Sequence, residues 1–377
     1  MFKAIQDPVW GYTEILEKFL KIIDTPEFQR LHWIRQLGMC YLVYPGAVHT
    51  RFQHSLGTMT LASQIAQKLE TKFPVEVTFA ALLHDIGHFP LSHSFEDFFE
   101  EKFHVNHEEN GREIILGKKG TGEIRECLES NDVDPEVITR ILSGKHREFQ
   151  LESGIVSGPL DADEMDYLVR DSYFTGTGNI AFSIKRMVDI LRTDGEKIFI
   201  EEKGITSVES ILLSRNLMHK SVYFHKTVRI AQKMIESAMK SLDKVDSSVM
   251  GMHDDIFMSY LRNQDSCSEK IRQIDRRNLY KVVFRDQAPD IRDPEIENKI
   301  LEKYPELIVD YVPPYAYQDR KKSKNEVLVK QGRKFMEISS LSPLLNSLYD
   351  SFNRRSIFIY GPQNLEIRPE EIRKLLD

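Results

Sequence analysis

The sequence has few cysteines and no long apolar run. Only 3 cysteines occur in 377 residues, and they are widely separated with no CxxC pair, so neither a disulfide framework nor a thiolate zinc site is expected. No stretch approaches the roughly 20 apolar residues of a membrane helix, and the first residues lack the basic and apolar pattern of a leader peptide. These absences favour a reducing, cytoplasmic location.

The charge balance lacks the excess of positive charge that is typical of nucleic-acid binding. The formal net charge is -7, whereas proteins that bind duplex nucleic acid commonly carry a basic domain or stripe. The length and the hydrophobic fraction of 41% are ordinary for a protein with a sizeable core, and they allow two domains. We therefore expect neither nucleic acid nor a membrane as a partner.

Apolar residues at helical spacing dominate the first two thirds of the chain. They predict helices over about 56–69, from about Val75 into His84-Asp85, from His107 behind an Asn106 cap, and over one unusually long stretch of about 204–242. Asp194-Gly195, inside the apolar and β-branched segment 187–201, predicts a small hairpin.

The pattern becomes mixed from about Tyr280. Short apolar runs predict strands at 282–284, 307–309, 327–329 and 357–360, with helical pieces between them. We therefore predict a mainly α protein with a helical core over residues 1–275, a small β-hairpin, and a smaller α+β lobe over residues 276–377.

An apolar run that ends in His84-Asp85 is the most informative feature of the sequence. The dipeptide alone is weak evidence, because His253-Asp254 repeats it in a polar stretch. Neighbouring residues on a helix diverge by about 100°, so the pair can hold an ion only at the helix edge, with other elements completing the shell. His54 and Asp163 are the candidates for that completion.

These four residues offer two imidazoles and two carboxylates. Such a nitrogen and oxygen donor set suits iron, manganese, zinc or nickel, and a metal held there could activate water and polarise a phosphoryl group. Taken singly, each residue is more often a buried histidine or a helix cap than a ligand. Taken together they favour a metal site, and a metal-dependent hydrolase is the hypothesis.

More histidines lie near the pair than one ion needs, namely His88, His93 and His107. Imidazole can donate to phosphate oxygens or act as general acid to a leaving alkoxide. Arg51, three residues before His54, would direct a guanidinium toward a bound phosphate. Glu96 could orient one of the imidazoles, although carboxylates in an acidic helix are commonly solvated.

Two sets of polar residues recur at helical spacing. Arg215, His219 and Tyr223 form a stripe that is either a wall for phosphate and base or an ordinary solvated face. A second set shares one side of a predicted helix and could hold sugar hydroxyls; it consists of Asp163, Asp166, Tyr167, Arg170 and Asp171.

Several segments together resemble the HD-domain phosphohydrolases, and most of all the deoxynucleoside triphosphate triphosphohydrolase branch with the SAM-and-HD-domain protein and dGTPase-like enzymes. The segments are DTPEFQRL at 24–31, QLG at 36–38, HTRFQHSLG at 49–57, HDIGHFPLSH at 84–93 and DADEMDYLVRD at 161–171. The resemblance continues through 215–220 and 277–281 and weakens in the last hundred residues.

The resemblance implies an HD-domain core and a role for each matching residue. The implied metal ligands, for one divalent transition metal (Mn, Fe, Zn or Ni, with Mg on the substrate phosphates as an option), are His54, His84, Asp85 and Asp163. The implied catalytic and phosphate-contacting residues are Arg51, His88, His93, His107 and Glu96. The implied substrate pocket consists of Gln36, Leu37, Arg51, Tyr167, Asp171, Arg215, His219 and Tyr223.

The implied reaction is hydrolysis at the α-phosphorus of a dNTP, which releases deoxynucleoside and inorganic triphosphate. Three positions depart from the pattern that the resemblance implies. Glu164 and Glu96 stand where family members with well-developed triphosphate binding carry Lys and Asp, and His32 replaces an Arg of nucleotide-regulated members. The regulatory pattern is nevertheless matched by Asp24, Gln29, Arg277 and Lys281, which implies a nucleotide effector site. A homodimer or homotetramer is expected. The open alternatives are a phosphatase or phosphodiesterase acting on another nucleotide, and a catalytically silent nucleotide-sensing regulator.

Overall fold

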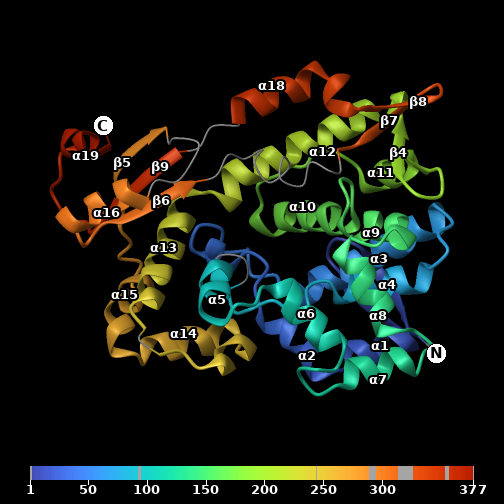
Figure 1. Cartoon of the computed structure of the whole chain (residues 1–377), viewed down its shortest axis with the longest axis horizontal. Helices are drawn as coiled ribbons and strands as arrows, with labels where there is room; N and C mark the ends of the chain where they lie inside the picture. The colour runs from blue at the N-terminus through green and yellow to red at the C-terminus, as the bar shows by residue number, and fades with distance from the viewer. Residues whose placement is uncertain are drawn as a thin grey trace.

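The computed structural model describes residues 2–91, 95–242, 244–287, 294–312, 326–352 and 356–376. Helices make up most of it, with small sheets at the edges (Figure 1). The prediction of a mainly α fold with a small hairpin and additional strands toward the C-terminus is therefore confirmed.

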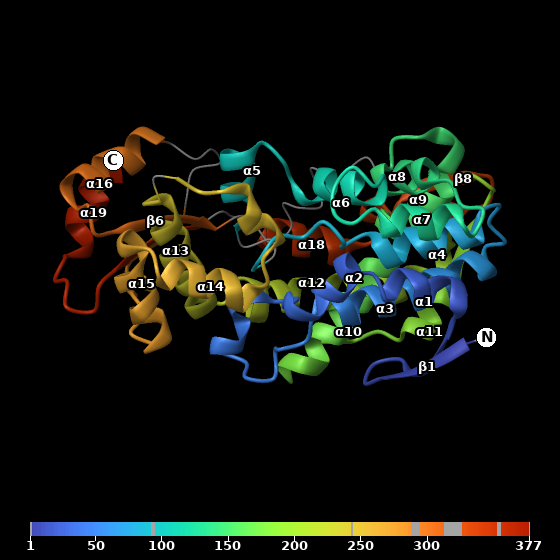
Figure 2. The same ribbon diagram turned by 90° about the horizontal axis from the view of Figure 1, so that it is seen from below.

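The chain begins with an antiparallel hairpin that the sequence analysis did not predict. Strand β1 (Phe2–Asp7) pairs with β2 (Gly11–Leu16), and Asp7 faces Gly11 across the turn. Helices α1 (Glu17–Ile23) and α2 (Pro26–Arg30) follow. Figure 2 shows β1 at one edge of the molecule, below α1.

A bundle of helices forms the centre of the first half. Its members are α3 (Arg51–Lys68), α4 (Pro74–Leu83), α5 (Glu96–Phe103), α6 (His107–Ile115), α7 (Glu123–Glu129), α8 (Pro135–Ser143), α9 (Gln150–Ser157) and α10 (Ala162–Thr175). The predicted helices over 56–69, up to His84 and from His107 are all present. Asn106 caps α6 by accepting a bond from the backbone N–H of Glu109 at 2.8 Å, as the sequence predicts.

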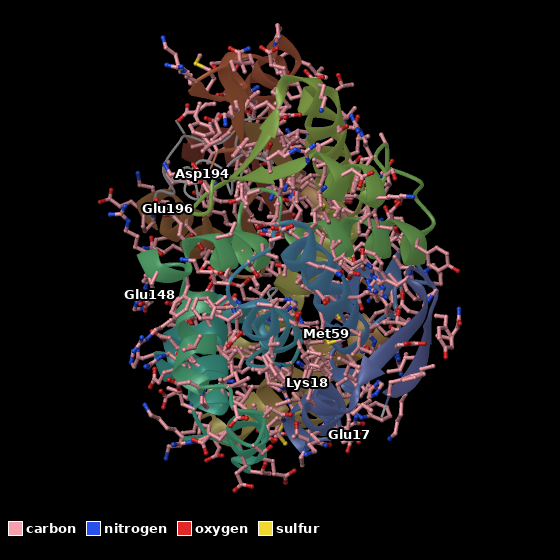
Figure 3. The ribbon with its side chains drawn as sticks, turned by 90° about the vertical axis from the view of Figure 1, so that its right-hand side faces the viewer. Glu17, Lys18, Met59, Glu148, Asp194 and Glu196 are labelled. Carbon is pink, nitrogen blue, oxygen red and sulfur yellow. The ribbon has the colours of Figure 1, made fainter. Side chains whose placement is uncertain are left out.

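The predicted hairpin is confirmed at Asp194-Gly195 but is shorter than expected. Strands β3 (Leu191–Thr193) and β4 (Ile198–Glu201) pair, whereas residues 187–190 belong to helix α11 (Ile184–Ile190). Met187 and Ile190 are buried three residues apart, and this spacing suits a helix as well as a strand. Figure 3 shows Asp194 and Glu196 of the turn close together at the edge of the molecule.

The single long helix predicted over 204–242 is wrong. Helix α12 (Ile205–Met218) passes into a π-helical turn, η6 (His219–Tyr223), and a new helix, α13 (Lys226–Lys240), begins after Phe224. Nδ1 of His225 accepts from the backbone N–H of Thr227 at 3.3 Å and so caps α13. Apolar periodicity on both sides of this break looks continuous in the sequence, which is why the break escaped prediction.

A separate hydrophobic cluster surrounds α13, α14 (Asp254–Arg262) and α15 (Asp265–Asp275), and α5 of the first half contributes Phe98 and Phe99 to it. A three-stranded sheet lies next to it in the order β5-β9-β6, made of β5 (Lys281–Gln287), β6 (Ile308–Val312) and β9 (Ser356–Gly361), with helices α16 (Pro294–Lys303) and α19 (Pro369–Leu376) beside it. Three of the four predicted strands lie here.

The fourth predicted strand lies far from the other three. Strand β7 (Leu328–Gln331) pairs in parallel with β4 and carries β8 (Lys334–Glu337) on its other edge, and α18 (Pro343–Phe352) packs on α12 (Figure 1). Val329, Ile338 and Leu345 thus join the hydrophobic cluster of the first half. The domain boundary at 275/276 stays a prediction, and residues on its C-terminal side contribute to both clusters.

Short 3-10 turns connect the helices: η1 (Leu31–Trp33), η2 (Gly38–Leu42), η4 (Arg147–Phe149), η5 (Glu202–Gly204), η7 (Ser247–Gly251) and η8 (Ile338–Ser340). Within the described parts of the chain, no helix combines the length and the hydrophobicity needed to cross a membrane.

Candidate active site

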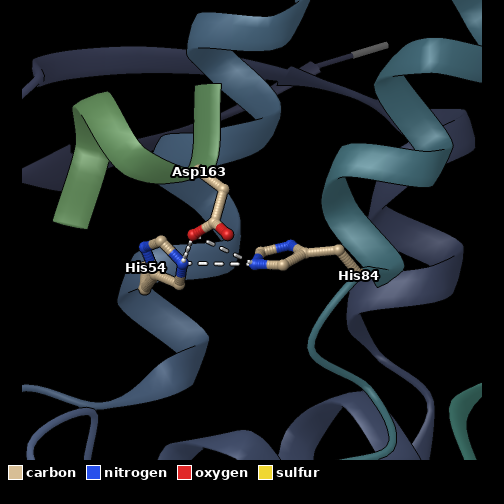
Figure 4. Close-up of side chains that lie close together, drawn as sticks. All are labelled: His54, His84 and Asp163. Carbon is tan, nitrogen blue, oxygen red and sulfur yellow. Dashed lines mark hydrogen bonds and ion pairs between the residues drawn. The ribbon is translucent and has the colours of Figure 1, made fainter. Parts of the chain in front are cut away.

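Two histidines and an aspartate from three helices converge on one point (Figure 4). His54 lies in the first turns of α3, His84 directly follows α4, and Asp163 lies in the first turn of α10. Nε2 of His54 is 3.2 Å from Nε2 of His84 and 3.0 Å from Oδ1 of Asp163. One ligand atom from each of the three residues lies within 4.8 Å of the others.

This arrangement fits a divalent transition metal. Two nitrogens and a carboxylate oxygen face one another, which is the donor set such metals prefer. Ligand bonds of about 2.0–2.1 Å place neighbouring donor atoms about 3 Å apart, close to the separations observed. Nδ1 of His84 donates to the carbonyl oxygen of Ala81 at 2.8 Å, so its Nε2 is left to face the group.

Asp85 borders this group from the side. Its Oδ1 is 3.3 Å from Nε2 of His84, and its Oδ2 accepts from Nη1 of Arg51 at 2.6 Å. Nε2 of His88 lies 3.1 Å from Oδ1. Burial alone would raise the pKa of Asp85, but Arg51 and the two histidines hold it well below its usual range. Asp85 is therefore an ionised carboxylate, and its role as a fourth ligand stays a prediction.

The segment after Asp85 brings two further predicted residues together. A Cβ atom on Gly87 would overlap with the backbone of His107 and Gly111, so only glycine lets this loop approach α6 so closely. As a result the rings of His88 and His107 stack with their centroids 4.2 Å apart. Glu96 accepts from the backbone N–H of His107 at 3.1 Å and contacts Nδ1 of its ring. His93 lies outside the described residues.

Asp171 is the centre of the predicted nucleoside pocket. Its Oδ2 accepts from the Tyr223 hydroxyl at 2.7 Å, and its Oδ1 lies 2.7 Å from Nε2 of His49. The rings of Tyr167 and His219 both pack edge-on against Tyr223. The π-helical turn carries His219 and Tyr223 toward α10, and such turns are frequent at functional sites.

Two other predicted pocket residues, Gln36 and Leu37, lie beside this group. The backbone N–H of Gln36 donates to the carbonyl oxygen of His49 at 3.0 Å, and the buried Oε1 of Gln36 has no hydrogen-bond partner. Leu37 packs against the hydrophobic cluster of the first half. The backbone contact places Gln36 next to the ring that holds Asp171.

Arg215 forms an ion pair with Glu164, which the resemblance did not predict. Its Nε lies 2.7 Å from Oε1 of Glu164, and both side chains are largely buried. The resemblance implies a Lys at this position, whereas the carboxylate of Glu164 forms an attractive pair with Arg215. Glu164 thus binds the guanidinium that was predicted to face the substrate.

Family comparisons agree with this geometry. The profile of the HD domain matches residues 51–171, and that of the HD associated region matches residues 182–371. The chain belongs to the HD-domain phosphohydrolases. The HD match runs from Arg51 to Asp171 and includes His54, His84 and Asp163. Its family makes the chain a metal-dependent hydrolase.

Individual relatives span much of this HD-domain chain. An uncharacterised protein of Methanocaldococcus jannaschii is 36% identical, over 100% of this chain and 84% of its own length. The deoxynucleoside triphosphate triphosphohydrolase SAMHD1 of Homo sapiens is 30% identical over 76% of this chain, but the match covers 55% of that enzyme. A hypothetical protein from Aquifex aeolicus has a crystal structure with a TM-score of 0.82 and 30% identity, over 100% of both chains.

The four residues predicted to bind an effector fall into two groups. Gln29 of α2 donates to the carbonyl oxygen of Ile23, next to Asp24. Arg277 follows α15 and contacts the carbonyl oxygen of Leu42, and Lys281 begins β5. Figures 1 and 2 both show α2 and α15 in different parts of the molecule. One copy of the HD-domain chain does not bring the two groups together, and the effector site stays a prediction.

Sequence reasoning missed two buried residues of this HD site. His49, inside the segment that carried the resemblance, contacts Asp171 and stacks on Phe174 with ring centroids 4.6 Å apart. Asp166 was grouped with residues that could hold sugar hydroxyls, but its Oδ2 lies 2.8 Å from Nδ1 of His54. The signal for Asp166 was its spacing, because it lies three residues after Asp163 on the same helix.

The predicted nucleoside pocket includes a histidine, His219, whose burial disfavours protonation. Burial, with Arg215 nearby, lowers the pKa of His219 to about 3. In the unfolded chain His219 takes up a proton near pH 6.5, whereas in the folded chain it stays neutral. Its contribution should therefore lower the free energy of unfolding of the wild type by about 1.4 kcal/mol per pH unit from pH 6.5 toward pH 3. We predict that His219→Gln removes this decrease in the free energy of unfolding at acid pH, as measured by urea unfolding at pH 7 and pH 5.

His146→Gln is the control for that measurement, because the His146 side chain is exposed. It should keep the wild-type dependence of stability on pH. If His219→Gln keeps it as well, then His219 is not the group that resists protonation.

Proposed function

We propose that the chain is a dNTP triphosphohydrolase, which hydrolyses the α-phosphorus ester and releases deoxynucleoside and inorganic triphosphate. The observation that carries the proposal is the juxtaposition of two groups on α10. Asp163 faces His54 and His84, and Asp171, two turns later, faces Tyr223 and His49. A nucleotide with its α-phosphate at the first group would have its sugar near the second.

His54, His84 and Asp163 would hold the metal, with Asp85 as the predicted fourth ligand. When bound, a divalent metal supplies an acidified water molecule and polarises a phosphoryl oxygen. Its identity, among Mn, Fe, Zn and Ni, is not distinguished by this donor set.

The surrounding side chains supply charge and a proton. Arg51, held by Asp85, would direct its guanidinium to the phosphate oxygens. His107 would protonate the leaving 5'-oxygen as a general acid while Glu96 orients its ring. His88, stacked on His107, would donate to a phosphate oxygen. In this proposal Tyr167 packs below the sugar and Asp171 binds its 3'-hydroxyl, which favours deoxyribose.

Product analysis tests the proposal. Metal-free protein is reloaded with Mn²⁺ or Mg²⁺ and incubated with each of the four dNTPs, with GTP and with simple phosphoesters. Release of inorganic triphosphate and deoxynucleoside supports the proposal. Phosphate or pyrophosphate as the product assigns the chain to the phosphatase or phosphodiesterase alternative. Tight nucleotide binding without turnover in the metal-loaded protein assigns it to the nucleotide-sensing regulator.

The Glu164 and Arg215 pair gives the phosphatase alternative its support, because it places a carboxylate where triphosphate needs positive charge. We predict that Glu164→Gln raises the preference for dGTP over dGMP by about tenfold, since removal of one nearby charge is worth about 1.4 kcal/mol. The measurement is the ratio of kcat/KM for the two substrates, in which a loss of folded protein cancels.

Glu148→Gln serves as the control, because Glu148 is exposed and pairs with Arg140 at 3.3 Å on the surface. An unchanged ratio in Glu164→Gln would mean that Glu164 does not set the number of phosphates accepted.

The cytoplasmic location, the homodimer or homotetramer and the nucleotide effector remain predictions from the sequence. No step of the proposed reaction depends on them.

A further inference from the structure

The N-terminal hairpin lies behind the predicted metal ligand His54 and is connected to it by buried polar groups. The hairpin precedes the matched HD domain, which begins at Arg51. Its turn, Asp7 to Gly11, inserts two side chains against α10, on the side of His54 that faces away from His84 and Asp163.

Asp166 is the first link in this connection. Its Oδ2 lies 2.8 Å from Nδ1 of His54 and also accepts from Nε of Arg170 at 2.8 Å. Its Oδ1 accepts from the indole Nε1 of Trp10 at 2.5 Å. Nη2 of Arg170 also donates to Oδ1 at 3.0 Å. The arginine therefore holds both oxygens of the carboxylate, and the hairpin adds a second bond to Oδ1.

Asp7 is the second link, and it also shapes the turn. Its Oδ2 accepts from Nη1 of Arg170 at 2.8 Å. Its Oδ1 accepts from the backbone N–H groups of Val9 and Trp10 at 2.8 and 2.9 Å. The same carboxylate thus folds the turn that presents Trp10 and holds the arginine that orients Asp166.

These groups are shielded from water, so their geometry is well defined. Asp166 and Arg170 are 0% exposed, and Asp7 is 9% exposed. Gly57, one turn after His54, leaves the space they need, because a Cβ atom there would overlap with Oδ1 of Asp166 and Nη2 of Arg170. The helices α3 and α10 can approach only because this residue has no side chain.

A fixed carboxylate at Nδ1 determines what the other ring nitrogen can do. An ionised carboxylate only accepts hydrogen bonds, so Nδ1 of His54 carries a proton, and Nε2 is the ring nitrogen that faces His84 and Asp163 and would bind a metal. Such carboxylate contacts set the tautomer and the orientation of metal-bound histidines, and their loss commonly weakens metal affinity by about 10–100-fold.

We propose that Trp10 and Asp7 are positioning residues for the metal ligand His54. The hairpin thereby becomes part of the active site, although it lies outside the HD domain in the sequence. The inference rests on the metal-binding part of the proposed function and not on the identity of the substrate.

The test compares Trp10→Phe with Trp33→Phe in the full chain. Phenylalanine keeps an aromatic ring and removes the N–H donor that Asp166 accepts from, together with part of the ring volume. Trp33→Phe makes the same change at a tryptophan that is 60% exposed. Affinity for Mn²⁺ is measured calorimetrically on metal-free protein. The expected result is an affinity about tenfold weaker in Trp10→Phe and unchanged in Trp33→Phe.

A spectroscopic measurement separates positioning from a merely structural role. With Co²⁺ in place of Mn²⁺, the visible absorption bands report the geometry of the ligands. They should shift in Trp10→Phe, at a temperature where the metal-free variant is fully folded. A lower melting temperature with unchanged Mn²⁺ affinity and unchanged bands overturns the proposal, because the hairpin then only stabilises the fold.

Asp7→Asn is the second variant and is used in the same way if Trp10→Phe does not fold. Asparagine still accepts the two turn N–H bonds but removes the charge that holds Arg170. The expected result is again weaker Mn²⁺ binding, and wild-type affinity in this variant overturns the proposal. Wild-type protein that binds Mn²⁺ without hydrolysing any dNTP would refute the proposed function alone, and the comparison of affinities would stand.

Discussion

Asp163→Ala is expected to lose the bound metal and to lower hydrolysis by about 10³-fold or more. Asp163 is the only carboxylate in the group formed with His54 and His84. Without it, the two imidazoles and the predicted ligand Asp85 remain, and this set, with one carboxylate fewer, holds a divalent cation more weakly. A metal contributes several kcal/mol of transition-state stabilisation in phosphoryl chemistry, and each 1.36 kcal/mol is a factor of ten in rate. The measurements are metal content after dialysis and release of nucleoside.

Glu136→Ala is the matched control for this variant. Like Asp163, Glu136 is an acidic residue in the first turn of a helix, and its side chain is exposed. Its removal weakens the favourable interaction with the helix dipole by a similar amount without touching the site. If Asp163→Ala keeps both metal and activity, the ligand assignment is wrong.

Local chemistry was enough to predict the central group of the site. The apolar run before His84 and the periodicity after Arg51 located α4 and α3, and the acidic segment around Asp163 located the start of α10. The structure brings His54, His84 and Asp163 together as the sequence analysis expected. Histidine and aspartate in such numbers are unusual enough in one region to be informative without coordinates.

Contacts between distant parts of the chain could not be predicted in this way. Trp10 donates a hydrogen bond to Asp166, which lies 156 residues later in the sequence. Nothing in the sequence around either residue specifies the partner. The parallel pairing of β7 with β4 is of the same kind, since Val329 was recognised as a strand residue but not as a neighbour of Ile200. Periodicity predicts that a residue is buried, and it does not predict what the residue is buried against.

The break in the helix predicted over 204–242 could not be predicted from the sequence for a different reason. The π-helical turn at His219 to Tyr223 keeps apolar residues on the buried side, so the pattern looks uninterrupted. Its effect is to direct His219 and Tyr223 toward α10, where Tyr223 donates to Asp171. Local helix propensity is here overridden by contacts that exist only in the folded protein.

Arg170→Met is expected to lower the free energy of unfolding by about 3–5 kcal/mol, the range found when one partner of a buried ion pair is removed. Methionine fills much of the volume but leaves Asp7 and Asp166 without their shared cation. Burial alone would raise the pKa of Asp166, but Arg170 and His54 hold it below its usual range. This stabilisation is therefore present at neutral pH and is lost as the pH falls through the folded-state value.

Arg125→Met separates the effect of burial from that of the ion pair itself. Nε of Arg125 lies 2.8 Å from Glu129, as Nε of Arg170 does from Asp166, and both pairs are four residues apart on a helix. The Arg125 pair is about half exposed, so water screens it and its loss should lower the free energy of unfolding far less than the loss of Arg170 does. Urea unfolding of both variants at several pH values provides the comparison. The loss of stability in Arg170→Met, relative to the wild type, should become smaller toward acid pH, because Asp7 and Asp166 then take up protons and no longer need a cation. If Arg170→Met loses no more stability than Arg125→Met, the buried pairs contribute no more than a surface pair.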